Sequence, residues 1–287
     1  MDEITLKAYA KINLSLAITG KRDDGYHNLS TIMQTISLFD KVTIKKSYDN
    51  ITCNTDNKNI PSGEGNIAFK AAKKFFEFVN IDGGAIISIK KNIPFGAGMG
   101  GGSADAAAVL KGLNELYSTK INLDDLIKIA SKIGADVPFA LFGGTALVQC
   151  IGDKISKLKP FMDCYILVVK PDLNISTAKA YSNYDKNFNS KVKNMDELVE
   201  CINSHNLKSF CAKMFNDFEM VTNIPIINKI KNEMLLFGAL GSCLTGSGSA
   251  VFGIYDDESK ANKANKKFKK YNLKSFLCTL IKNYKTV

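Results

Sequence analysis

Apolar and polar residues alternate over the first part of the chain. From residue 6 to residue 18 every even position is apolar, whereas the odd positions up to 15 carry Lys7, Tyr9, Lys11, Asn13 and Ser15. A period of two predicts a β-strand with one apolar and one polar face, because successive side chains of a strand point to opposite sides. Lys11 and Asn13 therefore share the polar face of this strand.

Farther along, strands and helices are indicated by their period and by the residues that flank them. Strands are expected in the apolar run that ends at Phe39 and at residues 42–44, 85–89, 146–149, 165–169, 242–244, 250–255 and 275–281. Helices are expected from the Gly63–Asn66 cap through Phe78, over 103–116 and 123–133, from Pro138, in several segments between 176 and about 237, and over 258–270.

The pattern is interrupted at residues 157–163 by polar residues and Pro160. A chain of 287 residues has room for two domains of ordinary size. We therefore expect an N-terminal domain at residues 1–157 and a C-terminal domain at residues 158–287. Four strands with helices between them predict a ferredoxin-like α+β fold for the second domain.

The composition is that of a globular protein, with 45% apolar and 23% charged residues. No run reaches the 18 or so apolar residues of a membrane span, and no basic-then-apolar signal segment opens the chain. These features predict a cytoplasmic protein. The seven cysteines are odd in number, scattered and without C-x-x-C spacing, so we expect reduced and mostly buried thiols and no metal or disulfide framework.

The formal net charge is +10, and many of the lysines lie between residues 260 and 274. They spread around an expected helix without the aromatic residues that would stack on nucleic-acid bases. We interpret them as a solvated helix face and expect no nucleic-acid partner. A positive field would still attract substrates that carry phosphate groups.

One segment is unusually rich in glycine. Residues 96–102 contain five glycines, between the strand at 85–89 and an alanine-rich helix. Glycines allow a positive φ and a close approach of backbone to an anion, and the following helix presents free N–H groups and the positive end of its dipole. We interpret residues 94–108 as a phosphate cradle.

The cradle differs from better-known glycine-rich loops. It lacks the Gly-Lys-Ser or Gly-Lys-Thr ending of a Walker loop. Gly96, Gly98 and Gly101 fit the G-x-G-x-x-G spacing of dinucleotide sites, but the acidic residues at 124–125 open another helix and do not end a second strand. No V-A-I-K, H-R-D or D-F-G segment of a protein kinase is present.

Four segments together resemble the GHMP kinase superfamily. They are Ala-Lys-Ile-Asn-Leu at 10–14 with Asp-Gly-Tyr-His at 24–27, the cradle, Gly-Ala-Asp-Val-Pro at 134–138, and Thr-Gly-Ser-Gly-Ser at 245–249. They occur in the order that is typical of the superfamily and span nearly the whole chain. The first and third segments particularly resemble the branch that phosphorylates cytidine diphosphate methylerythritol.

The resemblance implies a two-domain α/β (α+β) kinase with a ribosomal-protein-S5-domain-2-like N-terminal domain that binds the nucleotide and a C-terminal domain that binds the substrate. Such an enzyme transfers the γ-phosphoryl group of ATP, with Mg²⁺, to a hydroxyl of cytidine diphosphate methylerythritol in the non-mevalonate route to isoprenoids. It is expected as a monomer or weak homodimer without a tightly bound protein-ligated metal, and without nucleic-acid or membrane partners.

Site residues follow from the resemblance position by position. Lys11 and Asp136 match the catalytic pair, which would stabilise developing charge and accept the hydroxyl proton. ATP would bind at Pro94, Phe95, Gly96, Ala97, Gly98, Met99, Gly100, Gly101, Gly102, Ser103 and Ala104. The cytidine substrate would bind at Asn13, Tyr26, His27, Tyr181, Gly246 and Ser247, with stacking on the rings and a hydrogen bond to His27.

Simpler interpretations of three of these residues remain open. Asp136 precedes Val137-Pro138 and can be a helix cap, Lys11 an exposed strand lysine, and Tyr181 a core tyrosine. The chain also departs from the usual pattern, because Ala104 stands where a second serine is common. Asp105 lies beside the cradle and its role is left open by the sequence.

Two other functions remain possible. Another GHMP kinase, of mevalonate, homoserine or sugar type, would keep the cradle and the Gly-Ser-Gly-Ser loop but has no use for Tyr26 and His27. An RNA-binding module is the alternative from a different class, and its affinity would fall steeply with salt.

Overall fold

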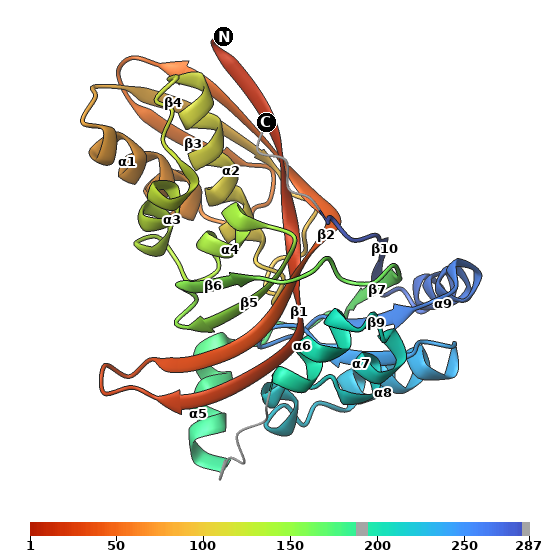
Figure 1. The fold of residues 1–287 in the computed structure, drawn as a ribbon. Helices are drawn as coiled ribbons and strands as arrows, with labels where there is room; N and C mark the ends of the chain where they lie inside the picture. The colour runs from red at the N-terminus through yellow and green to blue at the C-terminus, as the bar shows by residue number, and fades with distance from the viewer. Residues whose placement is uncertain (188–194, 283–287) are drawn as a thin grey trace.

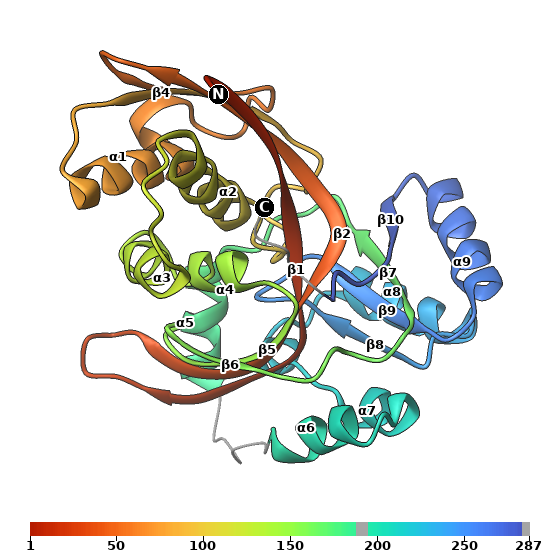
Figure 2. The same ribbon diagram turned by 45° about the horizontal axis from the view of Figure 1, so that its top comes forward.

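The computed structural model of the chain describes residues 1–187 and 195–282, and two β-sheets organise it (Figures 1 and 2). The first sheet has the strand order β3-β4-β2-β5-β6, with β1 paired to β2. Its strands are β1 (Glu3–Lys21), β2 (His27–Ser47), β3 (Ile51–Thr55), β4 (Gly84–Lys90), β5 (Thr145–Cys150) and β6 (Lys154–Lys157). The alternating segment at the N-terminus is therefore a strand, as predicted.

The β1–β2 hairpin consists of two long strands of the first sheet, of 19 and 21 residues, and it curves away from the rest of that sheet toward α5 (Figure 1). The sequence predicts two strands where β2 runs unbroken, and this prediction is wrong. Asp40 interrupts the apolar pattern, but its buried carboxylate accepts hydrogen bonds from the backbone N–H groups of Asn92 (2.5 Å) and Ile93 (2.8 Å). A buried polar residue whose hydrogen bonds are supplied by a distant loop interrupts the apolar pattern of the sequence without ending the strand. The short strands β3 and β6 were not predicted.

Helices cover one face of the first sheet (Figure 2). They are α1 (Ile67–Val79), α2 (Gly101–Leu116), α3 (Leu123–Ser131) and α4 (Val137–Phe142), and a short 3₁₀ turn, η1 (Gly63–Gly65), precedes α1. The side chain of Asn66 caps α1 by accepting from the N–H of Ala68 at 2.9 Å, as its place after the glycines predicts. The alanines of α2 are buried against β1 and β2, so small side chains let this helix lie close to the sheet.

The second sheet is antiparallel, with the order β10-β7-β9-β8. Its strands are β7 (Tyr165–Lys170), β8 (Gly241–Leu244), β9 (Val251–Tyr255) and β10 (Lys274–Cys278). Counted within this half of the chain the order is 4-1-3-2, which confirms the predicted ferredoxin-like arrangement. The helices of this half are α5 (Thr177–Asn187), α6 (Asp196–Asn203), α7 (Leu207–Lys213), η2 (Asp217–Met220), α8 (Pro225–Leu236) and α9 (Glu258–Lys270).

The two halves share contacts on both sides of residue 157. The largest buried apolar cluster contains Ile12 from the first half and Val168 and Phe252 from the second. After β10 the chain crosses to β2, where Ser37 N–H donates to Thr279 O and Ile281 N–H donates to Thr35 O, each at 2.9 Å. The domain boundary at 157/158 stays a prediction.

Two further expectations concern composition. Cys53, Cys201, Cys211, Cys243 and Cys278 are buried, Cys164 is half-buried and Cys150 is exposed, so most of the thiols are buried, as predicted. Within residues 1–187 and 195–282, no helix has the length and apolar character needed to cross a bilayer.

The Asn216 side chain joins η2 to the end of β8 and the loop that follows it, and generates a stability prediction. Its buried amide donates to Leu244 O (2.8 Å) and Gly246 O (2.9 Å), and its oxygen accepts from Phe218 N–H (3.0 Å). Asn216→Ala should lower the free energy of unfolding by about 1–3 kcal/mol, because buried carbonyl groups lose their donors. Urea denaturation measures this, with Asn59→Ala in an exposed loop as the control. Equal stability of the two variants would contradict the prediction.

Candidate active site

One cavity of about 700 Å³ brings together residues from both halves of the chain. Its lining includes the whole predicted catalytic and substrate set, together with part of the cradle: Lys11, Asn13, Tyr26, His27, Gly98, Gly100, Ser103, Asp136, Tyr181, Gly246 and Ser247. The other cradle residues lie outside the cavity: Pro94, Phe95, Gly96, Ala97, Met99, Gly101, Gly102 and Ala104. Their assignment to ATP remains a prediction.

The cradle has the backbone geometry that its glycines predict. Gly96, Gly98 and Gly100 adopt positive φ angles of 65°, 73° and 66°. Gly100 is the N-cap of α2, so the helix begins two residues before the predicted start at Ser103. The first amides of a helix have no partner within it, and here they follow directly on the glycine loop. This geometry suits an anion such as a phosphate group.

A second glycine loop, residues 245–249, braces the cradle from the other half of the chain. The Thr245 hydroxyl accepts from the N–H of Asn13 (3.1 Å) and donates to Gly98 O (3.2 Å). A Cβ atom on Gly98 would lie 2.1 Å from Thr245 O, and one on Gly246 would lie 2.9 Å from Gly98 O. Only glycine permits this approach of backbone to backbone. Gly98, Gly100 and Ser103 of the braced cradle thus form part of the cavity wall.

Lys11 and Asp136 form an ion pair at one end of the cavity, with 3.3 Å between Nζ and Oδ2. The side chain of Lys11 is 9% exposed, so the interpretation as an exposed strand lysine is wrong. Lys11 also donates to Asn13 Oδ1 (2.7 Å), and the Asn13 amide donates to Thr31 Oγ1 (2.9 Å). This chain of hydrogen bonds fixes the ammonium group beside the carboxylate.

Asp136 occupies the N-cap position of α4 but its side chain makes no capping hydrogen bond. The interpretation as a structural cap is therefore not supported by its contacts. The Asp136 side chain is 31% exposed and faces Lys11. It also lies close to the cradle: a Cβ atom built on Gly100 would be 3.6 Å from Asp136 Oδ2. A carboxylate held this way can accept a proton from a hydroxyl group in the cavity.

The other end of the cavity carries aromatic side chains. The rings of His27 and Tyr181 stack with 4.6 Å between centroids and 18° between planes, whereas Tyr26 is 68% exposed. Tyr181 also meets Phe218 edge-on at 4.9 Å. Tyr181 thus lines the cavity while packing on the core, and His27 lies directly against it. Apolar faces with one polar ring edge are suited to a nucleobase.

Several lining residues were missed by the sequence analysis. Thr177 pairs its hydroxyl with that of Ser247 at 2.9 Å, and Asp185 contacts His27 Nε2 at 2.7 Å. Ser182 and Phe218 also line the cavity. The helical spacing from Tyr181 could have indicated Thr177 and Asp185, which lie four positions to either side of it.

Asp105, whose role the sequence leaves open, does not face the cavity. Its carboxylate pairs at 2.5 Å with Lys91, which also pairs with Asp40, and all three side chains are buried. Burial raises the pKa of Asp105 to about 7, although the Lys91 ammonium opposes this. Asp105 is therefore part of a buried cluster beneath the cradle. Among the described residues no group of three or more His, Cys, Asp or Glu side chains could hold a metal ion.

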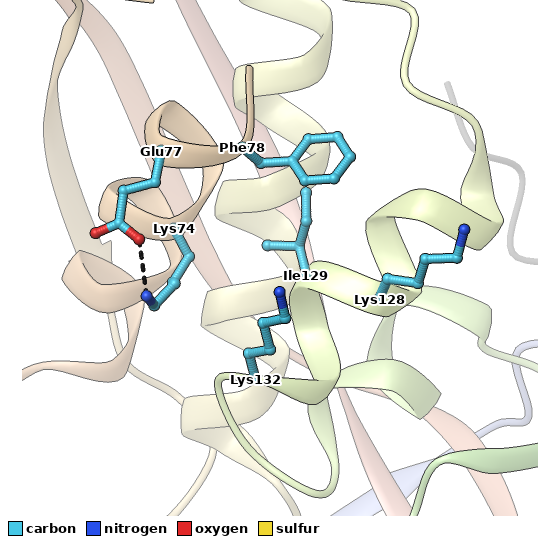
Figure 3. A pocket seen from close by; sticks show the side chains of 6 residues that line it. All are labelled: Lys74, Glu77, Phe78, Lys128, Ile129 and Lys132. Atoms are coloured by element: carbon cyan, nitrogen blue, oxygen red, sulfur yellow. Dashed lines mark hydrogen bonds and ion pairs between the residues drawn. The ribbon is translucent and has the colours of Figure 1, made fainter. Parts of the chain in front are cut away.

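A second hollow, of about 380 Å³, lies between α1 and α3 and contains none of the predicted site residues (Figure 3). It is lined by Lys74, Glu77, Phe78, Lys128, Ile129 and Lys132. Lys74 pairs with Glu77 and Lys128 with Asp125, each at 2.7 Å. Ion pairs within exposed helices are typical of a solvated surface, so this hollow needs no functional explanation.

Comparison with known proteins identifies the family. Residues 66–144 match the GHMP kinases N terminal domain, and residues 190–273 match the GHMP kinases C terminal domain. The chain is 47% identical over 270 residues to a 4-diphosphocytidyl-2-C-methyl-D-erythritol kinase of Clostridium tetani, covering 93% of this chain and 96% of that protein. The chain belongs to the 4-diphosphocytidyl-2-C-methyl-D-erythritol kinase family of GHMP kinases.

Further relatives agree with this. A 4-diphosphocytidyl-2-C-methyl-D-erythritol kinase of Acetivibrio thermocellus is 46% identical over 91% of this chain and 93% of its own. A solved structure of a 4-(cytidine 5'-diphospho)-2C-methyl-D-erythritol kinase has a TM-score of 0.82 at 28% identity, covering 96% of this chain and 99% of that one. A homoserine kinase of Cytophaga hutchinsonii shares the fold, with a TM-score of 0.78 at 23% identity and coverage of 99% and 96%. As a member of this kinase family the chain is an ATP-dependent enzyme.

The contact between Gly100 and Lys11 generates a prediction for this kinase. A Cβ on Gly100 would lie 3.1 Å from Lys11 Cγ, at a φ of +66° that side chains rarely adopt. Gly100→Ala should lower kcat roughly 10- to 100-fold, because small displacements of a catalytic group are costly. Gly102→Ala is the matched control, since Gly102 has an ordinary φ and its Cβ would meet only Ile67. Steady-state kinetics measure both variants; a larger loss in Gly102→Ala would refute the prediction.

The Lys11–Asp136 pair generates a second prediction. Asp136→Asn should lower kcat roughly 10²- to 10⁴-fold, the range for a lost acid–base group, and leave the melting temperature nearly unchanged because no capping bond is lost. Asp124→Asn, in the exposed first turn of α3, is the control and should keep full activity. Near-normal kcat together with a lower melting temperature in Asp136→Asn would show that the residue is structural.

Proposed function

We propose that this chain transfers the γ-phosphoryl group of ATP to the 2-hydroxyl group of 4-diphosphocytidyl-2-C-methyl-D-erythritol, with Mg²⁺ arriving as the ATP complex. The observation that carries the proposal is that one cavity holds three chemically different parts. The cradle suits phosphate, the Lys11–Asp136 pair suits a reacting hydroxyl, and His27 with the two tyrosines suits a base.

The chemistry follows from the positions of these groups. Phosphoryl transfer needs the hydroxyl and the γ-phosphoryl group held in line, with stabilisation of dispersed negative charge. The amides of the cradle and the positive end of α2 would hold the phosphates of ATP. Asp136 would accept the hydroxyl proton, and Lys11 would stabilise the charge that moves between the oxygen atoms. Asn13 keeps Lys11 in place.

The base end of the cavity favours this substrate over those of other GHMP kinases. Mevalonate and homoserine carry no ring that could stack on an aromatic side chain. Here His27, Tyr26, Tyr181 and Phe218 all line one cavity with the catalytic pair. Base–aromatic stacking contributes on the order of 1–3 kcal/mol for each base. A small acyclic substrate would leave this surface unused.

A phosphotransfer assay tests the proposal. The purified chain with ATP and Mg²⁺ is given 4-diphosphocytidyl-2-C-methyl-D-erythritol, mevalonate or homoserine, and the products are identified by ³¹P NMR. We expect kcat/KM for the cytidine substrate to exceed the values for mevalonate and homoserine by roughly 100-fold or more. A site built to hydrogen-bond a substrate discriminates strongly against molecules that leave its polar groups without a partner. The Asp136→Asn variant shows whether a contaminating kinase contributes. Preference for mevalonate or homoserine would refute the proposal.

A further inference from the structure

Three residues on one face of α5 surround the His27 ring, near the tip of the β1–β2 hairpin (Figure 1). The Tyr181 ring stacks on it, the Tyr184 ring meets it edge-on at 6.4 Å, and Asp185 Oδ1 lies 2.7 Å from its Nε2 atom. Positions 181, 184 and 185 lie on one side of a helix because they are three and four residues apart. The His27 side chain is only 6% exposed, so its ring is held on several sides.

The charge of Asp185 decides which nitrogen of His27 carries a hydrogen. Asp185 also pairs with Lys21 at 2.6 Å. The hydrogen bonds from Lys21 and from His27 hold the pKa of Asp185 below its usual range, so its carboxylate is ionised at neutral pH. An ionised carboxylate only accepts hydrogen bonds, and the His27 Nε2 atom must therefore be the donor. In a neutral imidazole the other nitrogen, Nδ1, then carries a lone pair.

Nδ1 is the ring nitrogen that remains for a ligand. Within residues 1–187 and 195–282 the only hydrogen-bond partner of the His27 ring is Asp185, and Nδ1 is not among the fully buried polar atoms without a partner. His27 and Asp185 both line the cavity that holds the catalytic pair. The orientation that Asp185 gives the ring thus leaves an acceptor for a group that enters the cavity.

We infer that Asp185 is a positioning residue that fixes the tautomer of His27 and thereby makes the site select cytosine over uracil. The inference rests on the proposed function, because it takes the base of the substrate to contact His27. The 4-amino group of cytosine donates a hydrogen bond, which Nδ1 can accept. Uracil has a carbonyl oxygen at this position, and two acceptors that face one another cannot bond.

An NMR experiment tests the tautomer independently of activity. The chain has only two histidines, His27 and His205, so the imidazole signals in long-range ¹H–¹⁵N spectra can be assigned with one His205→Gln variant. At pH 8 the full-length protein should show His27 with hydrogen on Nε2 and a lone pair on Nδ1. Asp185→Asn should lose this preference, because an amide can donate as well as accept. Hydrogen on Nδ1 of the unchanged protein, in either protonation state, would overturn the inference.

A binding experiment tests selectivity. Calorimetry with CDP and UDP should show that the unchanged protein binds CDP roughly 10- to 100-fold more tightly. Bound UDP would leave His27 Nδ1 and the uracil carbonyl oxygen without a hydrogen-bond donor. In Asp185→Asn and Asp185→Ala this ratio should fall to within about threefold, while KM for ATP stays the same. Lys21→Gln is the matched control, because it removes the other partner of Asp185 and leaves the carboxylate on His27.

The outcomes separate the inference from the proposed function. If the unchanged protein prefers CDP and Asp185→Asn keeps the full preference, the inference is wrong and the proposed function stands. If the unchanged protein binds neither nucleotide and does not phosphorylate the cytidine substrate, both are wrong. A Lys21→Gln variant that loses selectivity as strongly as Asp185→Asn would show that the charge network, not the His27 contact, sets the preference, and would also overturn the inference.

Discussion

The active site depends on one close approach of backbone to backbone. Gly98 in the cradle and the loop at Thr245 and Gly246 come from different halves of the chain and meet without room for a Cβ atom on either glycine. The Thr245 hydroxyl also bonds to Asn13 N–H and Gly98 O. This contact joins the cradle, the strand that carries Lys11 and the second half of the chain, and catalysis by positioning requires such fixed geometry.

The β1–β2 hairpin determines how the chemistry is distributed along the cavity. Lys11 and Asn13 lie in the middle of β1, whereas His27 begins β2 near the tip of the same hairpin. Because the two strands are paired along most of their length, Lys11 and His27 are fixed relative to each other by backbone hydrogen bonds. Asp136 and Tyr181 then approach this hairpin from different helices. The hairpin therefore sets the distance between the two ends of the site.

Much of this arrangement could be predicted from local patterns. Alternation identified β1 and the shared face of Lys11 and Asn13, and the glycines of the cradle indicated positive φ angles before a helix. The continuity of β2 through Asp40 could not be predicted, because the acceptor is satisfied by Asn92 and Ile93 across more than 50 positions. Helical spacing can place Asp185 on the same side of α5 as Tyr181, but its contact with His27, 158 positions away, could not be predicted. Local periodicity carries no information about such pairings.

The placement of Asp105 shows how an acidic residue in the first turns of α2 is compatible with the proposed phosphate cradle. A free carboxylate there would repel ATP. Instead, Lys91 lies between Asp105 and Asp40 beneath the cradle, and Asp40 is further satisfied by two backbone N–H groups. Burial raises the pKa of Asp105, and the Lys91 ammonium beside it opposes this shift. Lys91 thus balances the charge of Asp105 beneath the cradle, and the α2 amides and Lys11 are the groups near it that would favour a bound phosphate.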